Sequence, residues 1–514
     1  MLGNEQISRR TLLRGLGLAA AVAPFGLTAC STGPTAEPGS LLRVSQSKDP
    51  STLDPQVQGG LESMNVLINL FDTLTMRDTD NKLQPRLALS WEPVDEHTWR
   101  FVLRQGVKFH NGEDFNADVV KFSIERLIDP ATKSTIVELR YVTSVNVIDE
   151  YTVDIISSTP DPVLPEKVSL FGGVMVPPGY IREVGSKGFA AKPIGTGPYT
   201  FVSWRKDYRI EMLANPDHWN GAPAFKQLHF IPMPNAASAL ASLQSNGVDL
   251  VSGLTPEAAL QLQGYAGVEI ASHPGIRMHF VVLNTLDPVL GDVRVRRALN
   301  HAVDVPLLIE AVLDNHAKEA PTIVPREAFG FDPAVPPFER SVDKARQLLS
   351  EAGHPDGITL SFTASNADSL ICQALAGQLA KAGITLELNL LEPGTYSSRL
   401  SSDDQGALGA MYLTGSTGWT LDGEATMQSY IRSDRKRSRI KDPEADRLID
   451  VLEQKVDPGV RLEAFGQMQR LLHDQAFFLY LYQADLLYAT NNLAEWRPNV
   501  VGTLAMDTAT VKHG

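Results

Sequence analysis

The feature that most constrains this fold is an alternation of helical and strand-like segments in the second half of the chain. Asp343 to Ala352 places Ala and Leu side chains on one stripe at helical spacing, and Gly353 follows as a C-terminal cap. Ile358 to Phe362 is strand-like, Leu370 to Lys381 returns to helical spacing, and Ile384 to Leu391 is strand-like again. This β-α-β alternation predicts an α/β fold.

Further elements follow from the same periodicities. The predicted strands are Leu42 to Ser45, Trp99 to Leu103 and Thr152 to Ile156. The predicted helices are Asn116 to Leu127, Val293 to Val303 and Pro306 to Leu313. Asp304 is a predicted N-cap, with Pro306 in the first turn that follows it.

Length and charge limit the class of protein. A chain of 514 residues is long enough for two or three domains of about 100–200 residues each. Its formal net charge of −14 argues against nucleic-acid binding, which requires a basic surface. The same charge favours a cationic or zwitterionic ligand, although it also serves solubility alone.

The first 29 residues predict a secretory signal. Arg9, Arg10 and Arg14 precede an uncharged apolar stretch, and small residues lead up to Cys30. The apolar stretch is shorter than the roughly 20 residues of a membrane span. Ser8 to Arg14 resembles a twin-arginine export signal, although an ordinary basic segment would give the same arginine pair.

Cys30 resembles the lipid-modified cysteine of a bacterial lipobox. Lipidation there would anchor residues 30–514 to the outer face of the cytoplasmic membrane, and Ser31 to Ser40 has the composition of a flexible tether. Cys372 would then be the one remaining thiol, so no intramolecular disulfide is expected. Its helical surroundings favour a small buried residue over a reactive thiol.

Six segments together carry a resemblance to a known family. They are Asp49 to Pro55, Leu70 to Leu74, Leu83 to Trp91, Phe101 to Gly112, Gly195 to Tyr199 and Asp292 to Asn300. In this order they resemble the extracytoplasmic solute-binding proteins of ABC importers, in the peptide/nickel-binding branch known as family 5. Within these segments, Gly195 to Tyr199 and His110 are interpreted as structural turns, rather than as a phosphate loop and a metal ligand.

The resemblance implies a two-lobed periplasmic-binding-protein fold of type II, with a cleft between lobes joined by a hinge. Lobe I would comprise residues 41–64, 190–276 and 485–514, an extra domain II residues 65–189, and lobe III residues 277–484. The ligand would be enclosed as the lobes close, and the closed form would dock on the transmembrane permease subunits. We expect a monomer without cofactor or metal.

The segment Gly418-Trp419-Thr420-Leu421-Asp422 is the principal candidate for the ligand site. In peptide-binding members, a matching Gly-Trp-x-x-Asp segment lines the cleft, and its aspartate pairs with the ligand α-ammonium. The resemblance therefore assigns that role to Asp422, and a carboxylate in a water-poor cleft attracts an ammonium strongly. The alternatives are a loop-capping aspartate and a core tryptophan.

Three other residues are candidates by resemblance. Gly59 and Leu61 match family positions that pair main chain with an extended peptide, and Tyr482 lies near the predicted return crossing to lobe I. The arginine that dipeptide binders carry for the ligand carboxylate has no counterpart in Thr363 to Leu370. This departure argues against a strict dipeptide binder.

Several functions are consistent with these sequence features. The preferred one is capture of di- or oligopeptides, or of peptide-like solutes, for import. Oligosaccharide, opine and nickel-chelate ligands remain open, and so does a role as a ligand sensor. The sequence holds neither a G-x-S-x-G nor an H-E-x-x-H motif, so we expect no enzyme, although a linear search does not detect an assembled hydrolytic site.

Overall fold

The computed structural model describes residues 40–402, 404, 406–491 and 493–512. The predicted signal segment, Cys30 and the tether up to residue 39 lie outside the described residues. Where it is described, the chain is a mixed α/β structure, which confirms the predicted class. The described residues contain no helix that is both long and apolar enough to cross a membrane.

Eleven strands of the described chain form one sheet. In order across the sheet, ten of them are β15 (Ile384–Leu391), β14 (Ile358–Ser365), β16 (Met411–Thr417), β12 (Val268–Leu283), β17 (Phe478–Asn491), β11 (Leu250–Ser252), β1 (Leu41–Gln46), β10 (Gln227–Pro232), β9 (Arg209–Ala214) and β8 (Tyr199–Arg205). The eleventh, β13 (Ala317–Glu319), pairs with β17. All five strands predicted from the sequence are present.

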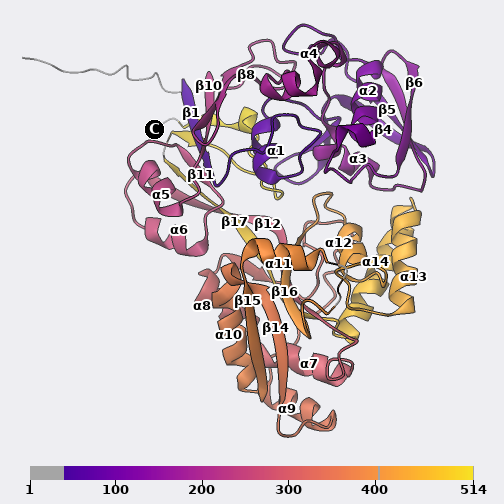
Figure 1. Ribbon diagram of the computed structural model, residues 1–514, viewed down its shortest axis with the longest axis vertical. Helices are drawn as coiled ribbons and strands as arrows, with labels where there is room; N and C mark the ends of the chain where they lie inside the picture. Colours follow the sequence, from indigo (N-terminus) through magenta and orange to yellow (C-terminus); the bar gives the residue numbers. More distant parts are fainter. Residues whose placement is uncertain (1–39, 403, 405, 492, 513–514) are drawn as a thin grey trace, which may run out of the picture. The chain divides into compact units, whose positions relative to one another are not determined.

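The long strands β12 and β17 join the two halves of this sheet. They lie side by side and antiparallel, from Val268 opposite Asn491 to Val282 opposite Phe478 (Figure 1). A break in register lies between Pro274 and Met278. Strands of the first half of the chain pair on one side of β12 and β17, and β14, β15 and β16 pair on the other. The two strands therefore connect the regions that the predicted lobes I and III occupy.

A second, antiparallel sheet lies within the predicted domain II. Its strands are β4 (Ala88–Asp95), β5 (Thr98–Leu103), β7 (Thr152–Ser157) and β6 (Val142–Asp149). Helix α2 (Ala117–Ile128) packs on β6 and β7 (Figure 1). Asn116 caps that helix by accepting a hydrogen bond from the Val119 amide.

The predicted helices of the second half are also present. Asp304 caps α8 (Val305–Leu313) by accepting from the Leu307 amide at 3.0 Å, as predicted. Gly353 follows α9 (Val342–Glu351) with a φ of +92°, a conformation that favours glycine at a helix end. Cys372 in α10 (Ser369–Ala380) is fully buried, and burial raises the pKa of its thiol to about 12. It is therefore a core residue, as expected.

The Gly195 to Tyr199 segment is a structural turn. A Cβ atom on Gly195 would lie 2.0 Å from the Leu70 carbonyl oxygen, so no larger residue fits there. His110 accepts a hydrogen bond from the Gly195 amide at 3.3 Å, and its other ring nitrogen lies 3.0 Å from the Gly197 carbonyl oxygen. Both observations support the structural interpretation of these motifs.

A buried ion network ties this turn to the core. The Asp72 carboxylate accepts hydrogen bonds from Arg86 Nε at 2.6 Å, Thr196 Oγ1 at 2.8 Å and Trp219 Nε1 at 2.9 Å. Burial alone would raise the pKa of Asp72, but Arg86 and the surrounding donors outweigh it and hold the pKa well below its usual range. Arg86 also reaches Asp507 at 3.3 Å, so this arginine bridges two carboxylates.

Candidate ligand-binding site

The Gly418–Asp422 segment is a tight turn directly after β16. The Leu421 amide donates to the Gly418 carbonyl oxygen at 2.8 Å. Leu421 itself has a φ of +54° and is buried, a left-handed conformation that is uncommon for a leucine. Such backbone persists only where the surrounding packing enforces it, so the neighbouring side chains are held in fixed positions.

Asp422 forms a buried ion pair with Arg461 of helix α14 (Pro458–Asp474). Arg461 Nη1 and Nη2 donate to the two carboxylate oxygens at 2.8 and 2.9 Å, and both residues are 4% exposed. The Asp422 carboxylate also accepts from the Glu424 amide at 3.0 Å, which is the contact expected of a loop-capping aspartate. The pairing with a ligand ammonium stays a prediction, and it would require sharing this carboxylate with Arg461.

Aromatic rings fix Arg461 in place. Its guanidinium lies 5.2 Å from the ring centre of Phe329 and 5.6 Å from that of Phe465. Its Nε donates to the Leu452 carbonyl oxygen at 3.1 Å. The arginine is therefore held on several sides, and Asp422 is the carboxylate that balances its charge.

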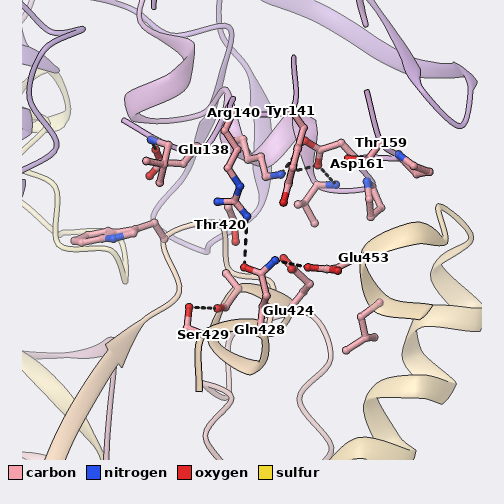
Figure 2. Close-up of a pocket in the computed structure, with 18 of the residues that line it drawn as sticks. Glu138, Arg140, Tyr141, Thr159, Asp161, Thr420, Glu424, Gln428, Ser429 and Glu453 are labelled. Carbon is pink, nitrogen blue, oxygen red and sulfur yellow. Dashed lines mark hydrogen bonds and ion pairs between the residues drawn. The ribbon is translucent and has the colours of Figure 1, made fainter. Parts of the chain in front are cut away.

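A pocket lies beside this turn. It has a volume of about 290 Å³, close to the lower end of ligand pockets at roughly 300–1,000 Å³. Its wall comes partly from the first half of the chain, within residues 137–141, 159–163 and at Lys167. The rest comes from the second half, within residues 417–420, 424–429 and 452–454 (Figure 2). The pocket thus lies between the regions assigned to domain II and lobe III.

Trp419 and Thr420 line this pocket and also anchor the turn to the first half of the chain. The Trp419 indole packs edge to face on Phe171, with ring centres 5.9 Å apart. Arg77 donates a hydrogen bond to the Thr420 carbonyl oxygen. The turn therefore bridges two regions of the chain that are far apart in sequence.

Two carboxyl groups near the pocket have raised pKa values. Burial, reinforced by Asp422, raises the pKa of Glu424 to about 7. Burial likewise raises the pKa of Glu166 to about 7, against the opposing effect of Arg77. Glu424 lines the pocket, whereas Glu166 does not. Glu424 is therefore a half-buried acid that lines the cavity.

The structure separates the other predicted site residues from this pocket. Gly59 is exposed, Leu61 is the first residue of helix α1 (Leu61–Leu67), and Gly418 is buried within the turn. Tyr482 is 2% exposed and stacks on His279, with ring centres 4.7 Å apart. None of these four lines the pocket, whereas Trp419 and Thr420 do.

Sequence reasoning missed most of the pocket wall. Arg140, Asp161 and Lys167 lie more than 200 positions before the turn, and no local motif links them to it. Glu424 was predictable from the sequence, because this carboxylate follows Asp422 by two positions, directly after the Gly-Trp-x-x-Asp segment.

Comparison with known proteins shows the family. Residues 82–438 match the family model of the bacterial extracellular solute-binding proteins, family 5 Middle, and the chain belongs to this family. It is therefore an extracytoplasmic substrate-binding protein of the kind that serves ABC importers, a family of binding proteins rather than enzymes.

Individual relatives agree with this placement. The glutathione-binding protein GsiB of Escherichia coli strain K12 is 27% identical over 382 residues, which cover 73% of this chain and 74% of the relative. The ABC transporter substrate-binding protein CtaP of Listeria monocytogenes is similar in structure, with a TM-score of 0.84, 21% identity, and coverage of 93% and 100% of the two chains. The periplasmic binding protein DppA of Helicobacter pylori, in complex with the peptide STSA, has a TM-score of 0.76, 22% identity, and coverage of 92% and 98%. These structures confirm the type II binding-protein fold.

Proposed function

We propose that this chain captures di- or oligopeptides, or peptide-like solutes, outside the cytoplasm and delivers them to the permease subunits of an ABC importer. The observation that carries this proposal is the pocket beside the Gly418–Asp422 turn, in a chain that belongs to the solute-binding family. Two relatives are a glutathione-binding protein and a binding protein in complex with the peptide STSA, and both support a peptide-like solute.

We infer that the hinge lies where β12 and β17 pass between the predicted lobes. The boundaries predicted after residues 276 and 484 fall inside these two strands, and the break in register of β12 lies at the first of them. Local irregularities of this kind absorb backbone rotation while the paired segments on both sides stay rigid. Ligand enclosure would then stabilise the closed arrangement of the lobes.

A thermal-shift screen of the purified protein tests the ligand class. The probes are di-, tri- and longer peptides, glutathione, an opine, oligosaccharides and nickel chelates. A ligand at 100 times its dissociation constant stabilises the folded state by about 2.7 kcal/mol, which gives a measurable shift. Shifts with peptides or glutathione support the proposal, whereas shifts confined to sugars, opines or nickel chelates would replace the peptide by that class.

We also propose that Cys30 carries a lipid that holds the protein at the outer face of the cytoplasmic membrane. The support is the arginine-rich, then apolar, then small-residue order of residues 9–30. Cys30→Ser should move the protein from the membrane fraction to the soluble exported fraction. Retention of the variant in the membrane fraction would contradict lipid anchoring.

A further inference from the structure

One hydrophobic core spans the regions assigned to lobe I and domain II. Its buried residues lie within residues 42–250, in strands β12 and β17 and within residues 494–509, with the exception of Leu421. Leu421 is 3% exposed and belongs to the Gly418–Asp422 turn of predicted lobe III. Trp419 packs against the same core as a partly buried residue. Among the described residues of predicted lobe III, this turn alone therefore contributes side chains to the core of the other regions.

Predicted domain II holds the tip of the turn from the other side. Phe171, which is itself buried, packs edge to face on the Trp419 indole with ring centres 5.9 Å apart. Arg77, the last residue of β2 (Thr75–Arg77), donates a hydrogen bond to the Thr420 carbonyl oxygen. The contact thus combines apolar burial with a charge-assisted hydrogen bond. Both partners of each contact belong to the chain, so the contact forms without a bound solute.

The base of the turn is fixed within predicted lobe III. The Leu421 carbonyl oxygen accepts from the Phe329 amide at 2.8 Å, and the Gly423 amide donates to the Phe329 carbonyl oxygen at 3.1 Å. Asp422 adds its buried ion pair with Arg461. If the two regions move apart, the turn should therefore stay with lobe III, and the contacts of its tip should break.

Two features of the turn oppose the buried position of its tip. The left-handed backbone of Leu421, with a φ of +54°, is unfavourable for a leucine. The Thr420 hydroxyl lines the pocket at 8% residue exposure and has no hydrogen-bond partner among the described residues (Figure 2). A buried hydroxyl without a partner is also unfavourable. These costs offset part of the apolar burial, as expected of a contact that forms and breaks rather than of a permanent core.

We propose that the Gly418–Asp422 turn is a latch that controls access to the pocket beside it. While the latch is shut, it holds the regions assigned to domain II and lobe III together. Their separation withdraws Leu421 from the core and widens the pocket, whose wall comes from both regions. Leu421 does not line the pocket, so it is a positioning residue rather than a ligand contact. The inference goes beyond the proposed function, because it concerns access and not the class of ligand.

A latch of this kind has a kinetic signature. It stabilises the shut protein to the same extent with and without a solute, so weakening it leaves the dissociation constant almost unchanged. The same change makes opening faster, so the association and dissociation rates both rise. A residue that contacts the ligand would instead change the dissociation constant, mainly through the dissociation rate.

Stopped-flow binding of tri-alanine and of glutathione to wild type and Leu421→Ala measures these rates. The observed rate for wild type should level off as the solute concentration rises, because opening becomes limiting. In Leu421→Ala both rates should rise by about tenfold or more, because buried methyl groups are lost, while the dissociation constant stays within about threefold of wild type. Arg77→Gln does not alter the pocket wall and should change both rates in the same direction by less.

Leu375→Ala is the matched control. Leu375 lies in α10, is fully buried, and belongs to a core made within predicted lobe III. Its truncation removes the same atoms from a core without touching the turn. It should lower the unfolding temperature and leave both rates at their wild-type values. If Leu421→Ala does not fold, Arg77→Gln carries the kinetic test.

Small-angle X-ray scattering of the free proteins supplies an arm that needs no ligand. Free Leu421→Ala should have a larger radius of gyration than free wild type, whereas Leu375→Ala should match wild type. Equal radii in all three proteins would overturn the latch, and so would a raised dissociation constant with an unchanged association rate. If wild type binds neither probe, the peptide-like ligand class fails, and the scattering comparison alone decides on the latch.

Discussion

Two groups of charges in this chain differ in how deeply they are buried and in how completely they are paired. Around Asp72, the carboxylate has an arginine, a threonine and a tryptophan as donors, and its arginine reaches a second carboxylate. Around the pocket, Glu424 and Arg140 have no partner of opposite charge among the described residues. The first arrangement stabilises the fold, whereas in the second Arg140 is exposed to solvent and Glu424 is only half-buried.

Desolvating a charge costs free energy, and Asp72 and Arg86 are buried, whereas Glu424 is half-buried and Arg140 is exposed. A buried charge that is matched by neighbours returns that cost within the folded protein. An exposed charge keeps its hydration and incurs little of that cost. The Asp422–Arg461 pair is buried and matched in charge, as the Asp72 network is, although the sequence predicts that Asp422 pairs with a ligand ammonium.

The largest effect is expected from breaking the matched network. Asp72→Asn removes the carboxylate charge that faces Arg86 and should lower the free energy of unfolding by about 3–5 kcal/mol. Urea unfolding followed by circular dichroism measures this loss. Asp80→Asn is the control, because Asp80 and Arg497 form an exposed pair 3.8 Å apart, and it should stay within about 0.5 kcal/mol of wild type. A small effect at Asp72 would contradict the assignment of this network to stability.

A smaller loss is expected at the Asp422–Arg461 ion pair. Asp422→Asn leaves Arg461 buried without a carboxylate and should destabilise the ligand-free protein by about 3 kcal/mol. Replacing Arg461 by Met in the same protein should recover part of this loss, because both charges are then removed. Unfolding of the free variants measures both values. Unchanged stability together with lost peptide binding would instead support the predicted ammonium-pairing role.

Local patterns predicted much of the fold. The helix that begins after Asp304 and the strands on both sides of α10 were predicted, because periodicity, capping and glycine positions act over a few residues. The two-lobed architecture came from the order of six resembling segments rather than from periodicity. The pairing of β12 with β17 joins segments about 200 residues apart, and no short pattern encodes it.

The pocket was only partly predictable for the same reason. Trp419 and Thr420 were found because they belong to a recognisable segment, and both line the pocket. Arg140 and Lys167 come from the first half of the chain and reach the pocket only through tertiary folding. The ion pair between Asp422 and Arg461 was also not predictable from the sequence. Arg461 lies 39 positions further along, and its helix must pack back on the turn to reach Asp422.

The smallest effect is expected at Glu424, where the substitution should raise the free energy of unfolding rather than lower it. Glu424→Gln should stabilise the free protein, and the gain should depend on pH. The pKa of Glu424 is raised from 4.5 to about 7 by burial and by Asp422, with Lys167, Glu453 and Asp161 also facing it. The folded wild type therefore keeps a proton that the unfolded chain releases, so wild type loses stability as pH rises between these values.

Thermal unfolding of wild type and Glu424→Gln from pH 4 to pH 8 measures this difference. The two proteins should be close in stability near pH 4, and the variant should lead by about 1–2 kcal/mol above pH 7. The raised pKa of Glu166 acts in both proteins and cancels in the comparison. A difference in unfolding free energy that stays constant with pH would contradict the raised pKa of Glu424. It would show that the ionised carboxylate is stabilised within the protein, as that of Asp72 is.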